Sequence, residues 1–331
     1  MSLQSEAWPA CPLDEWADTC TTLHMMTQVV GKVRLACAPM VNHWWHTALY
    51  VTARGLTTSA MPYGTRTLQI DFDFIDHVVV IDVSDGGRRV VPLGAGPVAD
   101  FYRAVMAALQ DLDTPVRIMP RPVEVADAVP FPDDFVHSTY VPAHVQRFWQ
   151  VLRQADRALA AFRSGFVGKC SPVHFFWGSF DHCVTRFSGR EAPEHPGGIP
   201  GLADWVTREA YSHECSSAGF WPGSTAFPEP AFYCYAYPEP PGFSRYHVRP
   251  AAAFYSDDLR EFVLPYEAVR TAGDPEAMLR DFFLSSYEAG ANLGGWDRRE
   301  LERHPSGAAP TAPHPAADGH EPGRSPGEEL G

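Results

Sequence analysis

The stretch from His174 to Arg190, HFFWGSFDHCVTRFSGR, combines the aromatic and β-branched residues of a strand with side chains that bind metals or transfer protons. His174 and Asp181 lie within it, and His213 follows in the segment YSHEC. Imidazole and carboxylate groups suit zinc or iron, and three such ligands leave coordination positions open for catalysis. We therefore predict a zinc or iron site formed by His174, Asp181 and His213.

Neighbouring side chains suit the other roles of an active site. The predicted general acid and base are Glu214 and His182. A predicted substrate-binding set combines two arginines for an anionic group with two aromatic residues for a pocket wall: Arg186, Arg190, Tyr235 and Trp221. The same polar residues also fit a simpler arrangement, in which each is hydrogen-bonded within a packed sheet, because no HxH, HxxxH or HExxH spacing occurs among them.

The metal prediction depends on an irregular strand. Strict alternation from His174 onward would place Asp181 on the opposite face of the sheet. A β-bulge at Gly178, in mid-strand, would turn Asp181 to the side of His174. We therefore expect a bulge at this glycine.

Several other chemistries are disfavoured. No glycine-rich phosphate loop connects a strand to a helix, so no nucleotide cofactor is expected, and no GxSxG elbow is present. The cysteines have no marked positive charge nearby that would activate a thiol. Tyr233, Tyr235 and Tyr237 alternate along AFYCYAYPEP and share one strand face, which fits either the wall of an aromatic pocket or ordinary packing.

The segments that position these residues form two similar halves. CAPMVNHWWHTALYVTARGLTTSAMPYG aligns with CSPVHFFWGSFDHCVTRFSGREAPEHPG, and VSDGGRRVVPL aligns with YSDDLREFVLP. Each half shows a helix, several strands and a second helix, which predicts an α+β fold of two pseudo-symmetric helix/antiparallel-sheet/helix repeats in one globular unit. The expected boundaries are 1–118 for the first repeat, 119–140 for a Pro-rich linker, 141–303 for the second repeat with an insertion near 198–230, and 304–331 for a disordered tail.

The expected helices and strands follow from periodicity and turn signals. Helices are expected at 15–36, 97–112, 148–166 and 275–290. Besides the stretch from His174, strands are expected at 44–53, 68–74, 78–84, 88–93, 231–240, 251–256 and 261–265.

Composition limits the class of partner. The 331 residues carry a formal charge of −14, from 26 Lys and Arg against 40 Asp and Glu, without a basic run, so we expect no nucleic acid. No stretch is apolar for the roughly 18 residues of a membrane span, and the N-terminal segment lacks a signal-peptide pattern. Seven cysteines without a CxxC pair fit a reducing compartment. We expect a soluble cytoplasmic protein with a small-molecule ligand and no membrane partner.

Four strings resemble a bacterial protein family of unknown function, number 5996. They are NHWWHTALYVTARGLTTSAMPYG, SPVHFFWGSFDHCVTRFSGREAP, YSHECSSAGFWPG and AFYCYAYPEPPGF. The resemblance extends from Trp8 to about Arg303 and implies a cytosolic bacterial protein. It implies no activity.

From the residues we expect an enzyme that uses the metal to act on a small organic molecule, by hydrolysis or by oxygen activation, at a composite pocket in the second repeat. The alternative is a non-catalytic binding or scaffold protein whose aromatic pocket holds an apolar compound. The sequence predicts no oligomeric state.

Overall fold

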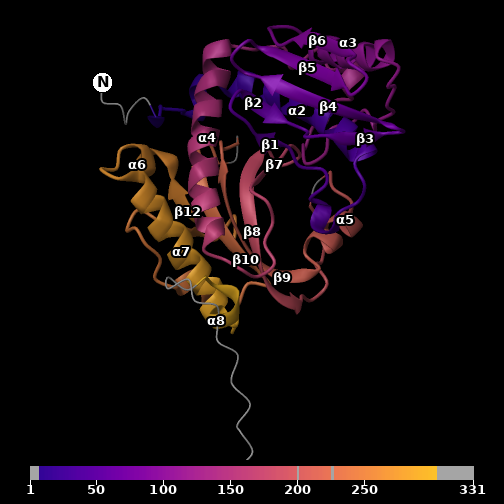
Figure 1. The fold of residues 1–331 in the computed structure, drawn as a ribbon. Coiled ribbons are helices and arrows are strands. Elements are labelled where there is room, and N and C mark those ends of the chain that lie inside the picture. The colour runs from indigo at the N-terminus through magenta and orange to yellow at the C-terminus, as the bar shows by residue number, and fades with distance from the viewer. Residues whose placement is uncertain (1–6, 200, 225–226, 304–331) are drawn as a thin grey trace, which may run out of the picture.

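The computed structural model describes residues 7–199, 201–224 and 227–303 and contains two antiparallel sheets, one above the other in Figure 1. The predicted tail at 304–331 lies outside these residues. The α+β fold class is confirmed. None of the described helices combines the length and the apolar character of a membrane span.

The first sheet contains the strands of the first half. They are β1 (Tyr50–Val51), β2 (Gly55–Thr57), β3 (Met61–Tyr63), β4 (Arg66–Asp73), β5 (Val78–Val83) and β6 (Arg88–Pro92). Their order is β1-β2-β4-β5-β6, and β3 also pairs with β4. Leu68, Ile70 and Phe72 alternate along β4 and are buried, which is the pattern of a sheet with one covered face.

Two helices accompany this sheet, α2 (Ala17–Cys37) and α3 (Val98–Asp111). The amphipathic α3 buries Phe101, Val105 and Leu109 on one face, as its periodicity predicts. In contrast, α2 is buried on all sides between Met25 and Arg34, because it lies in the interior of the molecule rather than on its surface.

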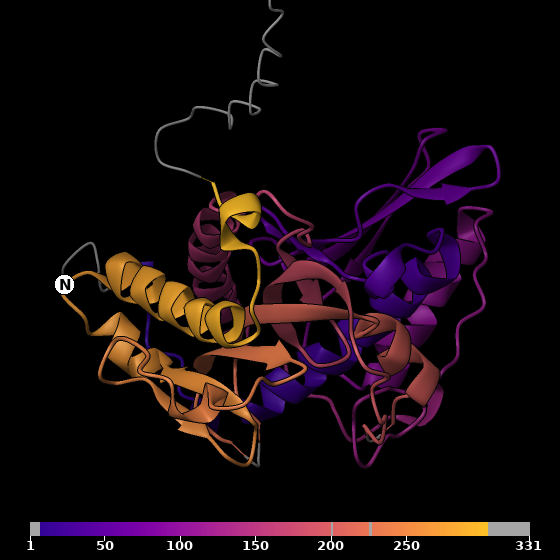
Figure 2. The same cartoon turned by 90° about the horizontal axis from the view of Figure 1, so that it is seen from below.

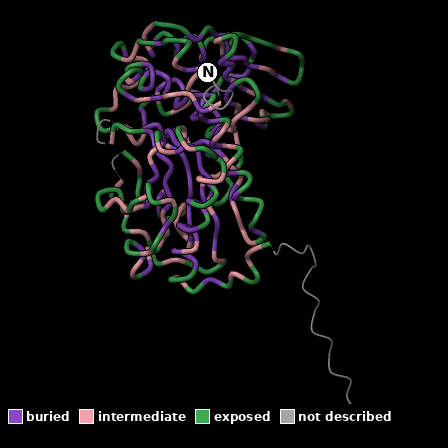
Figure 3. Tube along the Cα trace, turned by 90° about the vertical axis from the view of Figure 1, so that its left-hand side faces the viewer, coloured by how far each residue is buried: buried purple, intermediate pink, exposed green. Residues whose placement is uncertain are grey.

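The second sheet contains the longer strands. They are β7 (His174–Phe176), β8 (Asp181–Glu191), β9 (His213–Trp221), β10 (Ala231–Tyr237), β11 (Phe254–Ser256) and β12 (Glu261–Pro265), in the order β11-β12-β10-β9-β8-β7. The long helices α4 (Pro142–Ser164) and α7 (Pro275–Leu293) cover one face, as Figure 2 shows for α7. The buried parts of these strands run through the middle of the lower half in Figure 3.

Short helices complete the described chain. They are α5 (Asp204–Ala210), α6 (Tyr266–Arg270) and α8 (Arg298–Leu301), with 3-10 turns η1 (Leu13–Glu15), η2 (Asn42–Trp44), η3 (Phe131–Asp133) and η4 (Phe243–Arg245). The segment α5 belongs to the predicted insertion and packs on η2 of the first half. The insertion therefore connects the two halves in space.

In the described part of the chain, one β-bridge joins the two sheets. The amide of Leu49 donates to the carbonyl of Phe175, and the amide of Phe175 donates to the carbonyl of Leu49, at 2.8 and 2.7 Å. Buried apolar residues of both halves belong to one continuous core. The halves thus pack as one unit.

The internal duplication is not confirmed. The two matched hairpins are β5-β6 in the first half and β11-β12 in the second. In the first hairpin, β5 pairs with the rest of its sheet through β4, and β6 is the edge strand. In the second hairpin, β12 pairs with the rest of its sheet through β10, and β11 is the edge strand. The expected strand at 44–53 is also mostly absent, because His43 and Trp44 have φ of 56° and 62° and form the turn η2. The two halves therefore differ in strand order.

Candidate functional site

The stretch from His174 is a hairpin rather than one bulged strand. β7 ends at Phe176, the amide of Phe180 donates to the carbonyl of Phe176 at 2.8 Å, and β8 begins at Asp181. His174 pairs with Cys183, and Phe176 pairs with Asp181. Residues directly opposite each other in an antiparallel pair point to the same face, so His174 and Asp181 share a face. The predicted bulge is wrong, and a turn produces the same-face arrangement instead.

The face covered by α4 and α7 holds two of the predicted site residues. His182 Nε2 lies 3.0 Å from Asp156 Oδ1 on α4. The guanidinium of Arg186 lies 3.5 Å from the Phe162 ring centroid and 4.5 Å from that of Tyr287, and it donates to the carbonyl of Phe162. Burial lowers the pKa of Arg186 to about 10. The side chains of His182 and Arg186 therefore lie between the second sheet and its helices, and they contribute to the packing of the sheet against α4 and α7.

Two further predicted residues, Arg190 and Glu214, lie where β8 ends and β9 begins. Glu214 accepts hydrogen bonds from Ser188 Oγ at 2.8 Å and from Arg190 Nε at 2.9 Å. Arg190 also donates to the carbonyls of Gly294 and Gly295, which follow α7. These contacts join the sheet to the end of that helix.

The structure does not bring the three predicted metal ligands together. His213 begins β9 and lies beside His43, with ring centroids 5.7 Å apart, whereas Asp181 lies near the other end of β9, about 25 Å away along the strand. His174 is fully buried, neither ring nitrogen has a hydrogen-bond partner among the described residues, and burial lowers its pKa to about 3. Within the described ranges, no three His, Cys, Asp or Glu side chains are grouped to hold a metal ion.

Asp181 is the predicted residue with the most distinctive surroundings. Its carboxylate accepts hydrogen bonds from Ser179 Oγ and from the Tyr233 hydroxyl, and it is 9% exposed. Burial raises its pKa although both hydrogen bonds oppose the shift. Gly219 makes room for the phenol, because a Cβ there would lie 2.5 Å from the Tyr233 oxygen.

We use the name tyrosine face for the side of the second sheet opposite α4 and α7, which carries Asp181, Trp221, Tyr233 and Tyr235. The Tyr233 and Tyr235 rings are nearly parallel, at 12°, with centroids 6.1 Å apart. The Tyr235 hydroxyl lies 2.9 Å from that of Tyr211, which follows α5. The predicted alternation of tyrosines along β10 is therefore present, and the insertion supplies a third phenol.

Sequence reasoning missed two glutamates, Glu124 and Glu261. Glu124 lies in the segment predicted as a linker, has φ of 57°, and extends over Gly178, where a Cβ would lie 2.1 Å from its Oε1. Burial, with a contribution from the charge of Asp181, raises the pKa of Glu124 to about 7 and that of Glu261 to about 8. Neither glutamate has an ion-pair partner in the part of the chain that the structure describes.

The position of Glu261 follows from strand register. Cys234 pairs with Phe262, so the next step of the ladder places Glu261 opposite Tyr235. No local pattern in the sequence distinguishes either glutamate, since Glu124 stands among prolines and Glu261 begins an ordinary strand. The sequence signals for this face were the alternation of tyrosines along 231–240 and the polar residue Asp181 in an apolar stretch.

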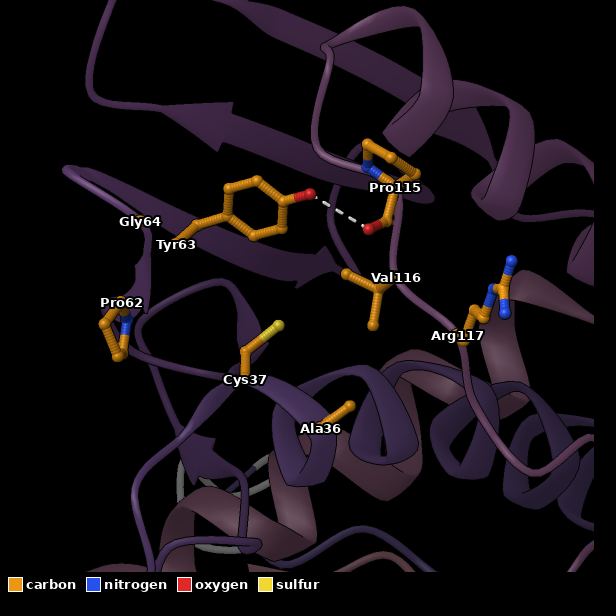
Figure 4. A pocket seen from close by; sticks show the side chains of 8 residues that line it. All are labelled: Ala36, Cys37, Pro62, Tyr63, Gly64, Pro115, Val116 and Arg117. Atoms are coloured by element: carbon orange, nitrogen blue, oxygen red, sulfur yellow. Dashed lines mark hydrogen bonds between the residues drawn. The ribbon is translucent and has the colours of Figure 1, made fainter.

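Two pockets lie elsewhere on the surface. One of about 460 Å³ is next to Glu124, and its lining is mostly apolar: Met119, Arg121, Pro122, Val123, Val125, Ala126, Ala128 and Gly201. The other, of about 330 Å³, lies at the end of α2, where Tyr63 donates to the carbonyl of Pro115 and Cys37 is partly buried (Figure 4). Burial raises the pKa of Cys37, so this thiol is poorly nucleophilic.

The profile of a family of unknown function, DUF5996, matches residues 8–303. The chain belongs to this family. No curated protein and no solved structure matches it. In this DUF5996 protein, the family region includes Glu124, Asp181, Glu261 and the tyrosine face.

Proposed function

We propose that the DUF5996 protein is an enzyme that binds a small organic molecule on the tyrosine face and acts on it by general acid–base catalysis. The observation that carries this proposal is the environment of Asp181, a carboxylate held by two hydroxyl donors, near two glutamic acids whose pKa values lie close to neutral. Carboxyl groups whose proton affinities are tuned by burial are typical of acid–base sites.

The three carboxyl groups suit different roles. Glu124 and Glu261 retain protons near neutral pH and are the candidate acids, which would donate to a leaving group. Asp181 is the candidate base, which would take a proton from water: burial raises its pKa, which makes it a stronger proton acceptor, and the two hydroxyl donors still stabilise its carboxylate form. An acid and a base on one face favour hydrolysis over oxygen activation.

The surrounding residues suit ligand binding. The phenols of Tyr211 and Tyr235 offer hydrogen bonds, and Trp221, stacked on Phe227 at a centroid distance of 6.1 Å, offers an apolar wall. A zinc or iron ion is not part of this proposal, because His174 and His213 lie apart from each other. A cytoplasmic location fits the seven free cysteines.

The test is a ligand screen followed by product analysis. Sugars, amines, esters and carboxylic acids are screened for stabilisation of the wild-type protein against heat, and each stabilising compound is then incubated and analysed by mass spectrometry. Asp181→Asn keeps an acceptor for Tyr233 but removes the base, so it should bind the compound and lose at least about 100-fold in its conversion. Asp82→Asn, on the first sheet, is the matched control and should behave as wild type.

The outcomes separate the two candidate functions. Conversion by wild type and by Asp82→Asn, but not by Asp181→Asn, supports the enzyme. Compounds that stabilise the protein and are recovered unchanged would overturn the catalytic proposal and favour a binding protein with an aromatic pocket.

A further inference from the structure

Lysine is rare in this chain. Among its 26 basic residues only Lys32 and Lys169 are lysines, and the others are arginines. Arginine stays charged under all ordinary conditions, whereas a lysine amine loses its proton when its surroundings disfavour charge and then becomes a nucleophile. Each of the two lysines therefore supplies a primary amine, which the guanidinium group of an arginine cannot replace.

Lys169 forms a close contact with a histidine from the other half of the chain. Its Nζ lies 2.6 Å from Nε2 of His43. Nδ1 of His43 lies 3.0 Å from the carbonyl oxygen of Ala210, which can only accept, so Nδ1 carries the ring hydrogen. The lone pair of Nε2 therefore faces the amine, and the histidine accepts a hydrogen bond from Lys169.

The histidine is held in a strained backbone. His43 and Trp44 both have positive φ, which is unfavourable for residues with a Cβ. The insertion holds this turn, because the His43 amide donates to Glu209 Oε1 at 3.3 Å and Trp44 Nε1 donates to the carbonyl of Val206 at 2.9 Å. Strain of this kind persists where the surroundings enforce it, and it is concentrated at functional sites.

The surroundings of the amine disfavour its charged form. Burial lowers the pKa of Lys169 and that of His43, and the charge of Glu209 opposes both shifts only in part. The rings of Phe187 and Trp45 lie 5.0 and 5.8 Å from Nζ, within cation–π distance, and oppose the effect of burial on the amine. Lys169 nevertheless retains partial exposure, so a ligand can reach it.

This pair is separate from the carboxyl groups. Phe187 stands six residues after Asp181 on β8, which is about 20 Å along the strand. Both lie on the same face of the sheet, because their spacing along the strand is even. The pair therefore forms a second site, and its test does not depend on the acid–base proposal.

We propose that Lys169 is the amine of a reactive site that condenses with an aldehyde or ketone to form an imine, with His43 as the proton acceptor. His43 Nε2 takes the ammonium proton, and the amine nitrogen bonds to the carbonyl carbon as the carbonyl electrons move to oxygen. The two remaining amine hydrogens leave with that oxygen as water, and a C=N bond remains. His43 returns its proton to the imine nitrogen, and no oxidant or reductant is consumed.

The test uses propanal with sodium cyanoborohydride at neutral pH, which reduces an imine to a stable secondary amine. Peptide mass spectrometry measures alkylation at Lys169 and at Lys32, which is 5% exposed and has no histidine contact in the described residues. We expect Lys169 to react about tenfold or more faster than Nα-acetyl-lysine in the same mixture, and Lys32 to react more slowly than Lys169. A rate at Lys169 no higher than that of Nα-acetyl-lysine would overturn the proposal.

A pair of variants tests the role of the histidine. His43→Phe keeps a ring but removes the acceptor, so the alkylation rate of Lys169 should fall to that of Nα-acetyl-lysine. His247→Phe changes an exposed histidine and should leave the rate unchanged. An unchanged rate in folded His43→Phe would contradict the assignment of His43, and the wild-type comparison remains decisive if this variant fails to fold.

Discussion

The carboxyl groups of the two sheets have opposite surroundings. On the first sheet, Asp73 contacts Arg54, and the pKa of Asp73 is lowered because this arginine and two backbone amides outweigh burial. On the second sheet, burial raises the pKa values of Asp181 and Glu261, and neither has an ion-pair partner among the described residues. Asp73 on the first sheet therefore has a cationic partner, whereas Asp181 and Glu261 on the tyrosine face have none among the described residues.

This difference is the basis for placing the proposed site on the second sheet. A carboxylate paired with arginine on a solvated sheet stabilises the fold slightly and has little capacity for chemistry. A carboxyl group without a cationic partner costs stability, and a chain keeps such a group where it binds or transforms something. The second sheet therefore carries the candidate site, and the following predictions test this contrast from the largest effect to the smallest.

Arg186→Ala should produce the largest loss. The side chain is 1% exposed and packs against Phe162 and Tyr287, so its removal leaves a cavity between the second sheet and its helices. We expect unfolding in urea to show a loss of about 3–5 kcal/mol. Arg89→Ala, on the exposed edge of the first sheet, is the control and should change stability by less than about 0.5 kcal/mol. Similar losses in both variants would contradict the contrast.

Gly219→Ala should be destabilising by about 1–3 kcal/mol. Its new Cβ would lie 2.5 Å from the Tyr233 oxygen and 2.7 Å from the His182 carbonyl, so the phenol must move away from Asp181. A Cβ added at Gly94 would meet no neighbouring atom within 4 Å, and Gly94→Ala should leave stability unchanged or slightly increased. Urea denaturation measures the stability of both variants. Equal stabilities would show that a Cβ at position 219 does not disturb the Tyr233 ring.

Glu261→Gln should change the pH dependence of stability. The folded protein keeps a proton on Glu261 up to a pKa of about 8, whereas the unfolded chain loses it near 4.5, so stability falls as the pH rises between these values. Glu261→Gln has no carboxyl group at this position, so this fall in stability with rising pH should be absent. The variant should match wild type near pH 4 and be more stable by on the order of 1–2 kcal/mol near pH 9, after allowance for solvent screening. Thermal denaturation across this range measures the difference, and parallel curves would mean that Glu261 titrates normally.

Arg88→Ala should have the smallest effect. Arg88 forms an exposed ion pair with Asp82 at 3.2 Å on the first sheet. Exposed pairs contribute about 0–1 kcal/mol, and we expect a loss of less than about 0.5 kcal/mol that decreases further in added salt. A loss of several kcal/mol in urea denaturation would show that charges on the first sheet are as important as those on the second.

Local sequence patterns predicted most elements of the fold. The apolar periodicity located α2, α3, α4 and α7, and β-branched runs located β4, β5, β6, β10, β11 and β12, because these signals depend on neighbouring residues alone. The expected strands did not include β2, β3 or β9. The secondary-structure predictions failed where contacts with residues far along the chain determine the backbone conformation. The turn η2 replaces an expected strand because α5, far along the chain, holds His43 and Trp44 in their strained conformation.

The sequence by itself determined the α+β class and the alternation that places Tyr233 and Tyr235 on one face, and it singled out Asp181 as a polar residue in an apolar strand. Only the tertiary structure decided which polar residues meet. It placed Glu124 over Gly178, Lys169 against His43, and His213 far from Asp181. The physical reason is that strand register and loop packing bring together residues remote in the chain, and no local pattern encodes that pairing.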